Sequence, residues 1–265
     1  GSPSGRSRRR GWDGATMRDL ADAARVLREA ANAPVLYGWH DGRAGRFGRG
    51  VIRIGLASDA RAATPASLRT DARDLPASIA PWPFTLWTRA GIAAANGVLG
   101  LRWCRAGQAP LALADALFPL NDARMYFAGY GSAGMAEAQW LVPHARFEPF
   151  AMALADAVAR DRPRIALVSS KLFAGRADGF GFDGAGIALA IQLPAPAQAG
   201  QRAFLERLAD LATTHGGRPN LIKDSTLDHG TARRAIPAFD AARARLAEHN
   251  PGGLYMSELA RRLAL

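Results

Sequence analysis

Two lysines stand out in this chain because every other basic side chain is an arginine. The sequence holds 34 lysine and arginine residues, and Lys171 and Lys223 are the only lysines, which leaves 32 arginines. A lysine ammonium is a compact charge whose pKa falls readily on burial, so that it can act as a base, whereas a guanidinium stays charged. Lys171 and Lys223 are therefore the first candidates for catalysis.

Lys171 follows two serines, Ser169 and Ser170. A serine activated by a nearby lysine is one form of acyl-transfer nucleophile. Ser169 and Lys171 would share a face if this segment is a strand, because side chains alternate along a strand. No neighbouring motif resembles an oxyanion hole, so acyl transfer is the weaker interpretation.

Metal and dinucleotide sites have little support in the sequence. Cys104 is the single cysteine and the five histidines lie far apart, so we predict no metal site. The stretch 129–134, GYGSAG, fits the GxGxxG pattern. That pattern binds a dinucleotide only between a buried strand and a helix. Here the preceding segment is not strand-like and the following one is, so we reject this interpretation.

The net charge of +11 raises the question of nucleic-acid binding. Four arginines crowd into the opening stretch 6–10, and the others are spread thinly without an aromatic stripe on which bases could stack. We do not expect nucleic acid to be a partner. No apolar run reaches the roughly 20 residues that span a bilayer. We expect a cytoplasmic protein, for which contact with a membrane surface is still open.

The first half of the chain predicts a helix over 17–31, strands over 33–39 and 50–58, a long connection over 59–86 and a helix near 86–98. Residues 1–16 read as a disordered basic tail. Beyond residue 223 the pattern predicts a helix over about 230–248, the breaker Asn250-Pro251-Gly252-Gly253, and a short final helix.

The clearest pattern lies between residues 135 and 223. Strand and helix periods there alternate in the order β-α-β-β-α-β, which is the split βαβ or ferredoxin-like arrangement. The predicted fold class is therefore α+β, an antiparallel sheet with helices on one face. In the strand 187–194, large aliphatic side chains alternate with Ala188, Ala190 and Gln192. We expect the aliphatic side to face the helices and the small side to face a flat ligand or another domain.

Three stretches carry a resemblance to a known family. They are GGRPNLIKDS at 216–225, LFPLNDARMYFAGYGSAGMAEAQWLVP at 117–143 and the end of the chain, NPGGLYMSELARRLAL. Together they resemble the cap domain and C-terminal segment of FAD-linked oxidoreductases of the vanillyl-alcohol oxidase superfamily. The resemblance spans about residues 20–265.

This resemblance implies an activity and a set of site residues. It implies hydride transfer from a hydroxyl of a sugar, or of a polyprenyl-phospho-sugar-like substrate, to FAD. It places Lys223 beside the flavin, with Asn220 where the family has a tyrosine, and it places Lys171 by the substrate. Gln139 and Trp39 would line the substrate pocket. Hydride arrival leaves negative charge on the flavin, which a compact cation at position 223 would stabilise.

The resemblance also implies how the chain is organised. Residues 17–215 would form the cap and substrate domain, and 216–265 would complete an FAD-binding domain. We expect that domain to be absent from this chain or supplied by a separate chain, so that this chain alone does not retain FAD. A cysteine that some members carry falls at about Ala190, which excludes covalent trapping there. Asn220 and Lys223 would reach one site only if the chain bends near Pro219.

Two other functions remain open. The first is a non-catalytic ferredoxin-like module whose open sheet face binds protein or RNA. The second is an inactive remnant of the oxidase, in keeping with the differences at Ala190 and Asn220.

Overall fold

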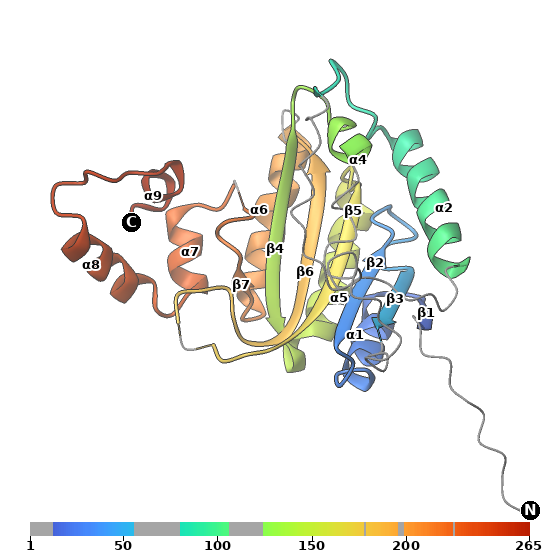
Figure 1. The fold of residues 1–265 in the computed structure, drawn as a ribbon, viewed down its shortest axis with the longest axis horizontal. Coiled ribbons are helices and arrows are strands. Elements are labelled where there is room, and N and C mark those ends of the chain that lie inside the picture. The colour runs from blue at the N-terminus through green and yellow to red at the C-terminus, as the bar shows by residue number, and fades with distance from the viewer. Residues whose placement is uncertain (1–12, 56–79, 106–123, 178, 196–198, 225) are drawn as a thin grey trace, which may run out of the picture.

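The chain folds around one seven-stranded antiparallel sheet, seen in a computed structural model that describes residues 13–55, 80–105, 124–177, 179–195, 199–224 and 226–265 (Figure 1). The strand order is β1-β3-β2-β5-β6-β4-β7. The strands are β1 (Asp13–Met17), β2 (Val35–His40), β3 (Gly50–Gly55), β4 (Met135–Pro143), β5 (Leu167–Ala174), β6 (Ala185–Pro194) and β7 (Arg218–Pro219). The predicted α+β class is confirmed.

The predicted split βαβ unit is present from β4 to β7. Its elements follow as β4, α5 (His144–Asp161), β5, β6, α6 (Ala199–Thr214) and β7. Within the sheet these strands stand in the order β5-β6-β4-β7, and each neighbouring pair is antiparallel. β7 is shorter than the predicted strand over 218–223, since residues 221–223 form a turn.

The main core lies between this sheet and helices α5, α6 and α1 (Leu20–Glu29). On β6, Ile187, Leu189 and Ile191 face it and are almost fully buried. Their partners include Phe150 on α5 and Phe204 on α6, which are also fully buried. The aliphatic side of β6 therefore faces the helices, as its alternation predicted.

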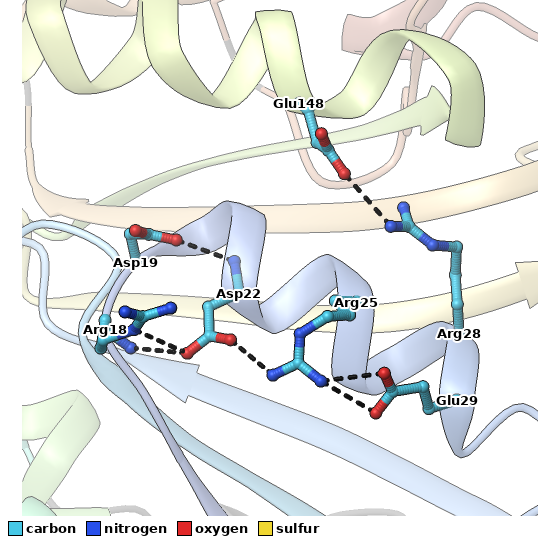
Figure 2. A network of polar contacts seen from close by, with 7 residues as sticks. All are labelled: Arg18, Asp19, Asp22, Arg25, Arg28, Glu29 and Glu148. Carbon is cyan, nitrogen blue, oxygen red and sulfur yellow. Dashed lines mark hydrogen bonds and ion pairs between the residues drawn. The ribbon is translucent and has the colours of Figure 1, made fainter.

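Helix α1 joins this layer through charges on its outer face. Figure 2 shows Arg25 between Asp22 and Glu29, with N–O distances of 2.7 and 2.9 Å. Arg28 reaches from α1 to Glu148 on α5, at 3.1 Å. These pairs are mostly exposed, so each contributes little to stability. Among these pairs, only Arg28–Glu148 links α1 to α5, and the buried side chains Leu20, Ala24 and Leu27 pack α1 into the core.

The described residues cover the opposite face of the sheet only in part. Helix α2 (Arg89–Arg105) and the short α4 (Arg124–Ala128) pack over the end formed by β3, β2 and β5. Trp39, Val51 and Leu167 lie there against Leu99 and Tyr126. The helix predicted near 86–98 is thus confirmed as α2, and it lies on the face away from α5 and α6.

Two boundaries differ from those predicted. The segment Asp13–Met17 forms β1 against β3, so a tail that ends at residue 16 and a helix that begins at 17 are both wrong. Asp19 caps α1 by accepting from the Asp22 amide, which starts the helix at Leu20. Residues 1–12 lie outside the described residues, as do residues 59–79 of the connection predicted over 59–86.

The predicted helix over 230–248 is two helices. α7 (His229–Ala235) ends at Ile236 and α8 (Phe239–His249) begins two residues after Pro237. A residue before proline is forced out of the helical region, and Ile236 is extended, with φ −121° and ψ 102°. α9 (Glu258–Leu263) is the predicted final helix. No helix in the described ranges has both the length and the apolar composition needed to cross a membrane.

Candidate functional site

The register of the sheet lines up five residues across its partly open face. Trp39 on β2 is opposite Ser169 on β5, Ser169 is opposite Ala190 on β6, and Ala190 is opposite Gln139 on β4. The Asn220 amide continues the row by donating to the Gln139 carbonyl at 2.8 Å. Neighbouring strands lie about 4.8 Å apart, so the row is roughly 19 Å long.

Two parallel rows flank this one on the same face. Lys171 on β5 is opposite Ala188 on β6, and Gln192 on β6 is opposite Glu137 on β4. Residues two apart on a strand share a face, so Lys171 lies beside Ser169 and Glu137 lies beside Gln139. Four of the five predicted site residues, Trp39, Gln139, Lys171 and Asn220, are therefore on one face.

A turn brings the fifth residue, Lys223, to the same face. β7 ends at Pro219, and the Lys223 amide donates to the Asn220 carbonyl at 3.1 Å. The Asn220 side chain donates to Gln139 Oε1 at 2.7 Å, and Lys223 Nζ lies 3.2 Å from Glu137 Oε1. The bend that the two residues require thus lies immediately after Pro219.

Lys223 is only half withdrawn from water, with 47% of its side chain exposed. Glu137 is much less exposed, at 12%. An ammonium has three donors, and one of them is used on Glu137. The amine is therefore held over the sheet and retains donors that could reach a second group.

A chain of polar contacts extends from Glu137 toward α4. Gln192 donates to Glu137 Oε2 at 3.2 Å, and Tyr126 donates to Gln192 Oε1 at 2.5 Å. The hydroxyls of Tyr126 and Tyr130 are 2.6 Å apart. Burial raises the pKa of both phenols, so both stay protonated. The network ties the carboxylate to the helix that covers this end of the face.

The surroundings of Lys171 lower the pKa of its amine. Burial lowers its pKa, the charge of Lys223 lowers it further, and Glu137 acts in the opposite direction. Its Nζ lies 5.8 Å from the centre of the Tyr37 ring. β2 and β5 pair only from Gly38 to His40, and a hollow of about 250 Å³, lined by Tyr37 and Lys171 among others, opens where they separate.

The small residues of the face are covered by their neighbours. Ala188 is 1% exposed and Ala190 is 5% exposed, so neither forms an open floor. Trp39 lies in the same row but is 4% exposed, in contact with Leu99 of α2. A ligand would therefore meet the layer of Gln139, Lys171, Asn220 and Lys223 first.

That layer offers N–H donors to a ligand group that carries negative charge. Lys223 has unused N–H donors, and the Gln139 side chain accepts from Asn220, which leaves the Gln139 amide N–H groups for another acceptor. The fit is at the edge formed by these donors, not over the alanines.

Sequence reasoning missed Glu137, which pairs with Lys223 and whose charge raises the pKa of Lys171. The signal was available, since Glu137 stands two positions before Gln139 on a predicted strand and must share its face. It also missed Tyr126 and Tyr130, whose i,i+4 spacing places them together only if the segment is helical. The GYGSAG stretch at 129–134 lies between α4 and β4. A dinucleotide-binding GxGxxG requires the reverse order, with a strand before it and a helix after it.

Comparison with known proteins leaves the family open. No protein-family model matches the chain, and no curated protein does. A solved structure described as "Structure of FgChi7B" is 12% identical, with a TM-score of 0.47, over 89% of this chain and 52% of that one. Another, described as "Solvent-stable cholesterol oxidase", is 13% identical, with a TM-score of 0.47, over 96% of this chain and 59% of that one. This chain spans little more than half the length of either, and likenesses this distant assign neither a family nor a function.

Proposed function

We propose that this chain is the substrate-facing and C-terminal portion of an FAD-dependent oxidoreductase that oxidises a hydroxyl of a sugar or sugar-like alcohol. The observation that carries the proposal is that Lys171 and Lys223 share one face of the sheet, where Lys223 pairs with Glu137 and its charge lowers the pKa of Lys171. These are the only lysines of the chain, they lie far apart in sequence, and both reach the face that α5 and α6 leave uncovered.

Bound FAD would supply the acceptor for the hydride that leaves the alcohol carbon. Lys223, with Gln139 and Asn220 beside it, would bind the edge of the flavin on which negative charge accumulates during reduction. At about 4 Å and an effective dielectric near 20, one unit charge contributes about 4 kcal/mol as an upper limit. Exposure of Lys223 and its pairing with Glu137 reduce this value.

Lys171 would take the proton of the substrate hydroxyl. Its lowered pKa increases the fraction of neutral amine near neutral pH, and only the neutral amine can accept a proton. The O–H proton would pass to Lys171 Nζ. The carbon that bears this hydroxyl would lose its hydrogen as a hydride, with the electron pair of the C–H bond, and its C–O bond would become a carbonyl. Lys171 is the better base because the Lys223 amine already donates to Glu137.

The test co-expresses this chain with whichever FAD-binding domain the adjoining upstream sequence encodes. We expect the complex to retain flavin and to be bleached by a sugar alcohol under anaerobic conditions. Lys171→Met should slow bleaching at least tenfold while flavin is retained, because it removes the base. Arg202→Met is the matched control, since Arg202 is an exposed cation on α6 paired with Glu206.

Two results would contradict the proposal. One is a complex that retains no flavin in any pairing, and the other is bleaching at the same rate in Lys171→Met as in Arg202→Met. Binding of a protein or RNA to the same face that is unchanged by Lys223→Met would favour the non-catalytic module instead.

A further inference from the structure

A second concentration of positive charge lies where α2, α5 and α6 meet, at the end of the sheet where β5 begins. Two cavities of about 490 and 410 Å³ adjoin there and share walls formed by Arg89, Arg162, Pro163 and Arg164. Arg43, from the segment between β2 and β3, lines the larger cavity. Thr88, Asp161, Gly200 and Gln201 line the smaller one.

The charges in these walls are far from balanced. Asp161 is the one acidic residue among them, and it is already paired with Arg160 at 3.0 Å and Arg207 at 2.8 Å. Arg43 is neutralised by Asp41 at 2.6 Å. Arg89 donates to the carbonyl of Arg162 at 2.9 Å, which leaves its charge uncompensated. The cavities therefore offer Arg89, Arg162 and Arg164 to a ligand.

Arg164 gives the clearest sign that a partner belongs here. Its Nε is buried, and it has no hydrogen-bond partner among the described residues. The backbone of Arg164 is fixed by Gln201, which accepts from its amide at 2.9 Å and donates to its carbonyl at 3.2 Å. Gln201 is itself 4% exposed. A buried charged donor held in place without an acceptor is rare in folded proteins.

Two helix starts add to the positive potential of the smaller cavity. α2 begins at Arg89, after Thr88, and α6 begins at Ala199, before Gly200. The first amides of a helix carry partial positive charge and bind anions. α5 ends at Asp161 beside the smaller cavity, with Arg162 as its C-cap. The partial negative charge at this helix end lowers the positive potential, and the charges of the arginines in the cavity walls outweigh it.

We propose that the two cavities bind a small phosphate-bearing ligand, with room for a pyrophosphate group across both. Guanidinium groups match the oxygens of a phosphate with paired hydrogen bonds. The site stands apart from Lys171 and Lys223 and does not depend on the proposed oxidation.

The test titrates the full chain with pyrophosphate by calorimetry at fixed ionic strength. We expect Arg164→Gln to weaken binding at least tenfold. Arg162→Gly should do the same, and it is the sharper variant, because Arg162 has a left-handed backbone with φ 46° that glycine adopts freely. The melting temperature of Arg162→Gly should equal or exceed that of the wild type, which separates lost binding from lost folding.

Arg261→Gln is the matched control, since Arg261 is an exposed arginine of α9 that pairs with Glu258 and lines neither cavity, and it should bind pyrophosphate like the wild type. Equal weakening by Arg261→Gln, or no weakening by Arg164→Gln and Arg162→Gly, would overturn the site. If inorganic phosphate binds as tightly as pyrophosphate, the ligand does not extend across both cavities, and that part of the proposal is wrong. An RNA oligonucleotide that binds more tightly, and is lost in the same variants, would replace the small ligand with nucleic acid.

Discussion

Glu137 is the residue through which the candidate site is connected. Its carboxylate lies 3.2 Å from Lys223 and accepts from Gln192, and its charge raises the pKa of Lys171 against the effect of burial. Removing either lysine or this carboxylate should therefore change the titration of the groups that remain.

Because the chain has only two lysines, their titration can be followed without interference. Reductive ¹³C-methylation labels Lys171, Lys223 and the N-terminal amine, and NMR then reports each pKa. We expect Lys171 to titrate below the ordinary range of a lysine, since burial and the neighbouring ammonium both favour its neutral form. Lys223→Met should raise the pKa of Lys171, and Glu137→Gln should lower it.

Arg202→Met provides the control for a general change in net charge. It should leave the pKa of Lys171 unchanged. A Lys171 pKa in the ordinary lysine range in the wild type, or one that is unchanged by both Lys223→Met and Glu137→Gln, would show that the two amines do not share a site.

His40 predicts a loss of stability in acid. It is fully buried, its Nδ1 lies 3.1 Å from the Gly48 carbonyl and its Nε2 lies 2.7 Å from Ser170 Oγ. Burial lowers the pKa of His40 from 6.5 to about 4. The unfolded chain therefore takes up the proton first, and the stability present above pH 6.5 is lost as the pH falls toward 4. The loss from this group should be about 2 kcal/mol by pH 5.

Urea unfolding of wild type and His40→Gln at pH 7 and pH 5 checks this prediction. The fall in unfolding free energy between the two pH values should be about 2 kcal/mol smaller in His40→Gln. An equal fall in both proteins would assign the acid sensitivity to other groups.

At the scale of elements, β6 separates the core from the candidate site. Ile191 is fully buried against the helices, and Ile222, in the turn after β7, is 90% exposed. Ile191→Ala should cost about 2–5 kcal/mol of unfolding free energy, because it removes core contacts and leaves a cavity. Ile222→Ala is the same chemical change at the surface and should stay within about 0.5 kcal/mol. Chemical denaturation of both variants measures the difference, and equal costs would contradict this burial pattern.

The elements whose pattern is periodic and local could be predicted from sequence. The order from β4 to β7 follows from strand and helix periods, and the alternation along β6 fixed which of its faces is buried. β1 was missed because Asp13–Met17 is stabilised by pairing with β3, a long-range contact that local propensity does not contain. The division of α7 from α8 could have been found, since Pro237 carries the signal.

The candidate site was predictable only in part. Placing Lys171, Gln139 and Asn220 on one face follows from strand alternation once the strands are known. The turn that returns Lys223 to Glu137 does not follow from alternation, since an ideal strand would point Asn220 and Lys223 to opposite faces. The burial of Trp39 beneath α2 depends on tertiary packing and has no local signal.

At the scale of the whole molecule, the sheet has two parts joined by a short seam. β2 and β5 pair through only three residues each, from Gly38 opposite Ser170 to His40 opposite Val168. A methyl group on Gly38 would fall on Ser170 Oγ and lie 2.8 Å from His40 Nε2. The seam therefore requires glycine at this position.

Gly38→Ala should destabilise the protein by about 1–3 kcal/mol, because the added methyl overpacks the seam. Gly97→Ala is the control, since a methyl there meets nothing within 4 Å and Gly97 lies within α2. It should be neutral or raise stability by up to about 1 kcal/mol, as alanine is the better helix former. Thermal unfolding distinguishes the two variants. A Gly38→Ala protein as stable as the wild type would show that β2 and β5 can move apart to accept the added methyl.

The measurement that tests the central claim most directly is the midpoint potential of flavin bound to the complex of this chain with an FAD-binding domain. The claim is that the ammonium of Lys223 stabilises the charge that FAD gains on reduction. Lys223→Met should lower the potential by some tens of millivolts, with roughly 90 mV as the ceiling that a 4 kcal/mol interaction allows for two electrons. Arg202→Met should leave it unchanged. A potential in Lys223→Met equal to or higher than that of the wild type would contradict the claim.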